Sequence, residues 1–212
     1  KQICESRGAR VPETYAVIER HGDIRRFVDL VGDRQEFVIK PAKGSEGRGI
    51  TVIVRHDREE FVTSSGAQTT AADLCYHLST ILAGLYSLAG QPDRAIVEQR
   101  IVCHPVFAGV AVGGTPDVRI ILYRCVPVMA MVRLPTQASR GRANLHQGAA
   151  AAGIHLATGQ TLGGVCQGRA VSAHPDTGKP IAGLQIPGWD ALLAGAMNLA
   201  DGLDGLAGGL SL

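Results

Sequence analysis

The chain has 212 residues, of which 45% are hydrophobic and 19% are charged. This composition indicates a globular chain of one or two domains and excludes an intrinsically disordered one. The 21 Lys and Arg residues against 19 Asp and Glu give a formal net charge of +2, too small to indicate nucleic acid or an anionic membrane as a partner. No apolar run reaches the roughly 18 residues of a membrane helix, and no signal peptide is visible.

The first thirty residues predict a helix end, a strand and a short helix. Residues 1–8 are expected to end a helix that Gly8 closes, and residues 11–18 are expected to form a strand. Asp23 is the expected N-cap of an amphipathic helix over residues 24–30.

Two further strands are expected on either side of a glycine-rich loop, over residues 36–40 and 50–54. A long amphipathic helix is then expected over residues 71–88, followed by a strand over residues 95–101. The apolar residues at helical spacing in that helix are Leu74, Leu78, Ile81, Leu82 and Leu85.

The second half of the chain predicts a β-hairpin, a polar loop and a final helix. The hairpin strands are residues 117–123 and 126–134, and the segment 135–148 is polar and loop-like. Asp190 is expected to cap a helix that runs to about residue 203. The whole pattern is α+β with antiparallel hairpins, and we expect a first lobe over residues 1–99 and a second over residues 100–212.

The glycine loop joins two strands and places Gly44, Gly47 and Gly49 within six residues. This spacing fits neither the P-loop nor the dinucleotide-binding fingerprint, because both require a helix after the loop. A glycine loop between strands can instead lay its backbone N–H groups over the phosphates of a nucleotide, and Lys40 at the end of the entering strand could reach the same phosphates. A plain glycine hairpin with a solvated lysine fits the sequence equally well.

Three polar segments could complete a nucleotide site. The segment Val97-Glu98-Gln99-Arg100-Ile101 is a strand that breaks into coil, which could offer backbone groups to an adenine edge or be an ordinary strand end. Asp117 and Arg119 share one face of a strand and Arg133 ends the paired strand, an arrangement that also suits a surface ion pair. The third segment is the loop with Arg142, Asn144 and His146, and such a loop is more often simply solvated.

The five cysteines are widely spaced and form no C-x-x-C pair. We interpret them as reduced core thiols of a cytoplasmic protein. A zinc or redox site built on Cys103, His104, His146 and Cys166 is an alternative that the spacing does not support.

Taken in order, these segments resemble the ATP-grasp superfamily. The run from Lys40 to Gly49 resembles its phosphate-binding loop, residues 98–101 its adenine hinge, and residues 114–133 the D-x-R hairpin of the ribosomal-protein glutamate ligases. The run Arg142-Ala-Asn-Leu-His-Gln-Gly148 resembles their R-x-N-L-H-x-G loop. The alpha-L-glutamate ligase-related proteins are the most similar, through phrases such as FVIKPAKGS, ANLHQGA and HPDTGKP.

The resemblance implies the ATP-grasp fold, with two α+β lobes that grip a nucleotide, and a role for each matching residue. Lys40 and the glycine loop would contact the ATP phosphates, the hinge would hold adenine, and Asp117 would lie near the ribose. The residues expected to bind ATP are Lys40, Gly44, Ser45, Gly47, Gly49, Glu98, Gln99, Arg100, Ile101, Asp117, Arg142 and Asn144. Those expected to act in catalysis are Arg119, Arg133 and Asn144.

The implied reaction is ligation: a carboxylate takes the γ-phosphoryl group of ATP to give an acyl phosphate and ADP, and an amine then displaces phosphate to give an amide. The implied partners are ATP, Mg²⁺, an amino acid such as glutamate, and an acceptor that the sequence does not identify. The family's E-x-N metal motif has no counterpart after Leu134, and the N-terminal domain of the family would precede Lys1. We therefore expect an internal piece of a longer enzyme, inactive alone, with metal ligands beyond Leu212. A non-catalytic nucleotide-binding or regulatory remnant is the alternative.

Overall fold

The computed structural model describes residues 1–57, 60–201 and 209–211. The chain forms two compact units. Residues 12–101 form one, called here the glycine-loop unit, and residues 1–11 with 102–212 form the other, called the hairpin unit.

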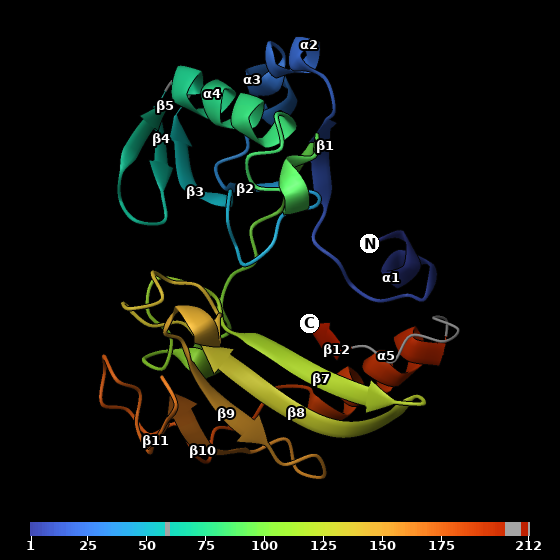
Figure 1. Cartoon of the computed structure of the whole chain (residues 1–212), viewed down its shortest axis with the longest axis vertical. Coiled ribbons are helices and arrows are strands. Elements are labelled where there is room, and N and C mark those ends of the chain that lie inside the picture. The colour runs from blue at the N-terminus through green and yellow to red at the C-terminus, as the bar shows by residue number, and fades with distance from the viewer. Residues whose placement is uncertain (58–59, 202–208, 212) are drawn as a thin grey trace. The chain divides into compact units, whose positions relative to one another are not determined.

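The glycine-loop unit is an antiparallel sheet of six strands with helices on one side (Figure 1). The strand order is β1-β6-β2-β3-β4-β5. The strands are β1 (Thr14–Ile18), β2 (Phe37–Pro41), β3 (Thr51–Asp57), β4 (Glu60–Thr63), β5 (Gln68–Thr70) and β6 (Ala95–Glu98). The helices are α2 (His21–Ile24), α3 (Phe27–Val31) and α4 (Ala71–Leu82), with a short 3₁₀ turn at Leu88–Gly90.

The core of this unit lies between the sheet and its helices. Three fully buried phenylalanines from α3, β2 and β4 pack edge to face or tilted: Phe27, Phe37 and Phe61. The apolar side of α4 completes it, as predicted, through Leu74, Leu78, Ile81 and Leu82.

Two of the predicted helices are wrong in extent. The helix expected over residues 71–88 ends at Leu82, because Gly84 takes a φ of +83° and turns the chain back against Gln91. Leu85 is consequently 67% exposed instead of lying on the apolar face. The helix expected over residues 24–30 is two short helices, and the Asp23 carboxylate accepts a hydrogen bond from the N–H of Arg20 at 3.2 Å from within α2, not as the N-cap.

The hairpin unit is a second antiparallel sheet, with strand order β11-β10-β9-β8-β7-β12. Its strands are β7 (Asp117–Tyr123), β8 (Val126–Leu134), β9 (Ala150–Ile154), β10 (Thr161–Cys166), β11 (Arg169–Val171) and β12 (Gly209–Ser211). Its helices are α1 (Gln2–Ser6) and α5 (Trp189–Asp201), with 3₁₀ turns at Pro105–Phe107 and Leu145–Gln147. The bounds predicted for the hairpin β7–β8 are confirmed.

Helix α5 packs on β7 and β8 and covers one face of this sheet (Figure 1). The helix begins at Trp189, so Asp190 lies in its first turn and is not its cap. Its expected end at residue 203 falls outside the described residues. The N-terminal segment joins this unit because the Asn198 side chain donates to the Arg7 carbonyl oxygen at 3.2 Å.

Candidate functional site

The glycine loop is attached at its first residues to the segment that follows α4. The N–H of Lys43 donates to a carboxylate oxygen of the buried Asp93 at 2.9 Å, and Gly44 forms an isolated antiparallel bridge with Ser87. At the tip of the loop, Glu46 has a φ of +58° and its carboxylate lies 4.0 Å from Nε of Arg48. This ion pair offsets the negative charge that Glu46 would otherwise bring to a phosphate site.

The last residue of the loop, Gly49, is held by α4 and by Tyr86. Its carbonyl oxygen accepts a hydrogen bond from Nε2 of His77 at 3.0 Å, and the His77 and Tyr86 rings lie 5.6 Å apart. Burial lowers the pKa of His77 below its usual value, against a smaller raising effect of the bond to Gly49. His77 is therefore favoured as a neutral imidazole with its proton on Nε2.

Lys40 is not a solvated lysine. Its ammonium forms an ion pair with Glu98, which lies on the adjacent strand β6 and whose side chain is only 8% exposed. The other residues expected at the adenine hinge also contact their own unit: Gln99 accepts from the N–H of Glu13 at 3.3 Å, and Arg100 pairs with Glu36 at 2.9 Å. Ile101 is exposed.

In the hairpin unit, Asp117 and Arg133 face each other across β7 and β8 and form a two-point ion pair, with Nε of Arg133 at 2.6 Å from Oδ1 of Asp117. Arg119 lies on the same face of β7, as predicted, because the residues that alternate with it point into the core. Its Nε is buried and has no hydrogen-bond partner among the described residues. Arg119 and Arg133 were both predicted to stabilise charge in the reaction. Among the described residues, Arg133 has a carboxylate partner and the Nε of Arg119 has none.

The polar loop over residues 135–148 is built on buried hydroxyl groups. Thr136 and Ser139, each 1% exposed, bond to one another's backbone, and the Thr136 hydroxyl also donates to the Gly148 carbonyl at 2.8 Å. Asn144 accepts from the N–H of His146 at 3.0 Å, and Arg142 donates to the Gln147 side chain at 3.3 Å. The loop is thus hydrogen-bonded internally on buried hydroxyl groups, while Arg140 and His146 are exposed.

The turn with the sequence HPDTGKP fixes this loop from outside. His174 is 1% exposed; its Nε2 donates to the Pro135 carbonyl at 3.0 Å, while its Nδ1 accepts from the N–H of Asp176 at 3.3 Å. The Asp176 carboxylate accepts from the N–H of Gln137 at 2.7 Å. The sequence motif itself indicates no role for this turn, and His77 and Asp93 were not predicted because neither belongs to a motif.

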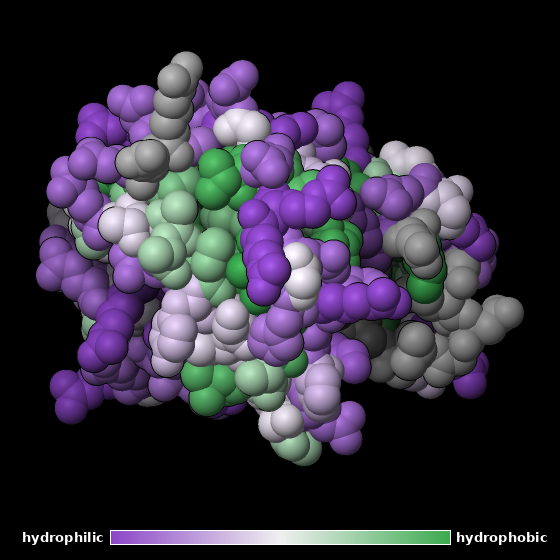
Figure 2. Space-filling model, turned by 90° about the horizontal axis from the view of Figure 1, so that it is seen from above, coloured by the Kyte–Doolittle hydropathy of each residue, from purple (hydrophilic) through white to green (hydrophobic). Residues whose placement is uncertain are grey.

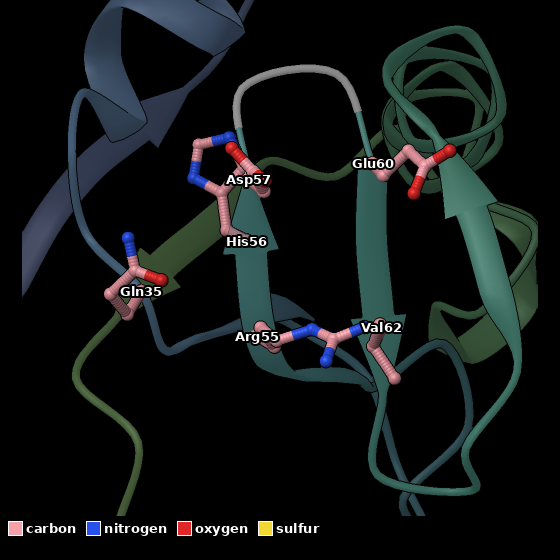
Figure 3. Close-up of a pocket in the computed structure, with 6 residues that line it drawn as sticks. All are labelled: Gln35, Arg55, His56, Asp57, Glu60 and Val62. Carbon is pink, nitrogen blue, oxygen red and sulfur yellow. The ribbon is translucent and has the colours of Figure 1, made fainter.

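A polar pocket lies elsewhere, beside the ends of β3 and β4 that are connected to each other (Figure 3). It is lined by Gln35, Arg55, His56, Asp57, Glu60 and Val62. His56 is buried and stacks on Phe61 with ring centroids 4.3 Å apart, and Arg55 is directed toward Val62 on the neighbouring strand. None of these residues was predicted for the site, and their charges give no excess of cations for a phosphate.

No three His, Cys, Asp or Glu side chains in the described part of the chain gather into a group that could hold a metal ion. A zinc site at Cys103, His104, His146 and Cys166 is therefore not found there. Burial raises the pKa of the Cys103 and Cys166 thiols. None of the described helices is long and apolar enough to cross a bilayer. The face drawn in Figure 2 is mostly hydrophilic, with hydrophobic residues in small groups.

Comparison with known proteins gives one family and a distant structural likeness. A family model described as sugar-transfer associated ATP-grasp matches residues 1–208. Among solved structures, the crystal structure of D-cycloserine synthetase DcsG matches with 14% identity and a TM-score of 0.38, over 95% of this chain and 67% of that one. No curated protein matches significantly.

Proposed function

The chain belongs to the family of sugar-transfer associated ATP-grasp proteins. We propose that it binds ATP and is part of an ATP-dependent ligase that joins a carboxylate to an amine. The observation that carries this proposal is Arg119. A buried guanidinium nitrogen without a partner is costly, so its retention on β7 favours a role in binding an anion.

Each unit contains residues proposed to contact ATP. Lys40 and the backbone N–H groups of Gly44, Ser45, Gly47 and Gly49 would bind phosphate oxygens, and residues 98–101 would receive adenine. The ion pair with Glu98 supports this role for Lys40, because it holds the ammonium at the entrance of the loop. In the hairpin unit, Asp117 would lie near the ribose, and Arg142 and Asn144 would bind the γ-phosphate.

The proposed reaction has two steps. A carboxylate oxygen bonds to the γ-phosphorus of ATP while the bond from that phosphorus to the β,γ-bridging oxygen breaks, which releases ADP. The amine nitrogen then bonds to the acyl carbon, the bond from that carbon to the phosphate oxygen breaks, and the amine loses a proton. Positioning and charge neutralisation account for most of the catalysis in such a reaction.

The arginines have distinct parts in this scheme. Arg119 would bind the oxygens of the transferred phosphoryl group or of the tetrahedral intermediate. Arg133, already paired with Asp117, would orient that carboxylate and reduce its repulsion of the nucleotide.

Mg²⁺ is the metal that this family implies, and no group of three or more metal-ligating side chains lies among the described residues, so we name no ligand for it. We assign no step to the metal. For the amine-bearing substrate we propose an amino acid, with glutamate the first candidate because of the resemblance to glutamate ligases. The carboxylate or amine that receives it could be attached to a saccharide, in line with the family's association with sugar transfer. The five cysteines form no disulfide in the structure, as is usual for proteins of the reducing cytoplasm, and we propose that the protein acts there.

The test is to titrate the purified chain with ATP by calorimetry and to measure ADP release with glutamate and a panel of carboxylates. Arg119→Ala is expected to weaken ATP binding or slow ADP release at least tenfold, while Arg124→Ala, at the exposed turn of the same hairpin, changes neither. Equal behaviour of the two variants would remove Arg119 from the site. ATP binding without ADP release is expected both of a piece that is inactive alone and of a regulatory, non-catalytic module, whereas any ADP release would rule out that alternative.

A further inference from the structure

Both ends of the glycine loop are attached to one region of the chain, α4 and the segment between α4 and β6. At the first end, Asp93 accepts from the N–H of Lys43 and Ser87 bridges Gly44. At the other end, His77 of α4 donates to the carbonyl oxygen of Gly49. Between these two ends, the N–H of Arg48 donates to the Ser45 carbonyl at 3.1 Å, and Glu46 pairs with Arg48.

The glycine at position 49 is required by this attachment and not only by a nucleotide. A Cβ built there would lie 2.6 Å from Cγ and Cδ2 of Tyr86, and the φ of +75° is one that other residues rarely adopt. The Tyr86 ring in turn packs on His77. The end of the loop is therefore enclosed by an imidazole and a phenol ring, with no room for a side chain.

We propose that His77 is a positioning residue for the glycine loop: its Nε2–H fixes the Gly49 carbonyl, so that α4 sets where the loop's N–H groups point and movement is confined to residues 45–48. The phosphate part of this inference rests on the proposed function. The attachment itself does not, because all of its residues lie within one unit.

The chemistry of this contact separates a hydrogen-bonding role from a packing role. The Gly49 carbonyl can only accept, so the side chain at position 77 must donate. Glutamine keeps an amide N–H near the place of Nε2, whereas leucine fills a similar volume and cannot donate. His77→Gln should therefore retain the attachment and His77→Leu should lose it. Tyr76, its exposed neighbour on α4, gives the matched control Tyr76→Leu.

The first measurement is limited proteolysis, because the loop carries two trypsin sites, after Lys43 and after Arg48. We expect cleavage after Arg48 to be about tenfold faster in His77→Leu than in the unchanged chain, as a lost local contact raises the open population. His77→Gln and Tyr76→Leu should keep the original rate. Cleavage after Arg34, in the same unit, is the internal reference. If cleavage after Arg34 accelerates together with cleavage after Arg48, the unit is unfolding as a whole. If cleavage after Arg48 does not accelerate, His77 does not hold the loop. Either result overturns the proposal.

The second measurement is the Kd of ATP for the same variants. His77→Leu is expected to weaken binding about tenfold through lost preorganisation, and His77→Gln by less than threefold. If His77→Leu loosens the loop and yet binds ATP as the unchanged chain does, the positioning role is overturned. If the unchanged chain binds no ATP, the proposed function fails, while the proteolysis result still decides whether His77 fixes the loop.

Discussion

The glycine loop and the polar loop over residues 135–148 are each held by a hydrogen bond from a histidine to a backbone carbonyl, but the two loops differ in how deeply they are buried. In each, a histidine Nε2 donates to a backbone carbonyl at 3.0 Å, from His77 to Gly49 and from His174 to Pro135. His174 is almost completely enclosed and the polar loop contains buried hydroxyls of its own. The glycine loop is attached at its ends and has an exposed tip.

If both loops bind ATP as proposed, this difference gives two ways of preparing a site for an anion. The hydroxyl framework of the polar loop would hold Arg142 and Asn144 in place, so that reorganisation on binding is small. The glycine loop keeps a tip that can close over a ligand and exclude water, with its ends fixed so that closure is reproducible. If the comparison is right, changes in the framework of the polar loop should destabilise the fold, and changes around the glycine loop should act on local motion.

The largest effect is expected where the backbone of the polar loop touches a second loop. A Cβ on Gly114 would lie 1.7 Å from the Gly141 carbonyl oxygen, a contact that only a backbone shift can relieve. Gly114→Ala should destabilise the hairpin unit by about 3 kcal/mol or more, as overpacking does, measured by urea unfolding. Gly163→Ala is the control, since nothing lies within 4 Å of a Cβ there. A Gly114→Ala variant as stable as this control would mean that the loop yields easily and is not a fixed framework.

The next effect is expected at His174. His174→Leu removes two hydrogen bonds, the donor to the Pro135 carbonyl, which keeps its bond from the N–H of Val112, and the acceptor of the Asp176 N–H; the loss costs about 1–3 kcal/mol. His174→Gln keeps a donor and should recover part of the loss. The measurement is the midpoint of thermal unfolding together with the Kd for ATP. Loss of ATP binding without loss of stability would show that His174 acts on the ligand and not through the framework.

A smaller effect is expected at Asp93. Its two carboxylate oxygens accept from the N–H groups of Lys43 and Arg94 at 2.9 and 2.8 Å, and asparagine can supply only one acceptor of this kind. Asp93→Asn should cost about 1 kcal/mol of unfolding free energy and increase hydrogen exchange at Lys43 and Gly44. Glu19→Gln, at an exposed ion pair with Arg94, is the control and should change neither. Unchanged exchange in Asp93→Asn would place the attachment of the loop elsewhere.

The sequence predicts the fold well where periodicity is long and local. The hairpin β7–β8 and the apolar side of α4 follow from alternation and helical spacing alone. The end of α4 does not, because a single glycine at position 84 stops the helix while Leu85 continues its apolar pattern. The β12 strand pairs with β7 from a tail without periodicity, so long-range pairing determines it.

The residues of the candidate site can be named from motifs, but their contacts cannot. The motifs identify Lys40, Arg119 and Arg142 as residues of interest, but no spacing rule pairs Lys40 with Glu98 or Arg133 with Asp117 before the strands are aligned. His77 lies 28 residues from the carbonyl it binds, and His174 lies 39 residues from its own. Such supporting residues become visible only when the fold brings distant segments together.

The smallest expected effect is the pH dependence of the glycine-loop attachment. Burial lowers the pKa of His77 in the folded chain, whereas an unfolded histidine titrates near its ordinary value of about 6.5. Between these two values the unfolded chain binds more protons, so the contribution of neutral His77 is complete above about pH 6.5 and is lost as the pH falls through the folded value. The free energy of unfolding of the unchanged chain should therefore fall relative to that of His77→Gln between pH 7.5 and pH 5, since all other titrating groups are common to the two proteins. Parallel pH profiles would contradict a partly buried, neutral His77, and with it the view that the end of the glycine loop is more shielded from water than its tip.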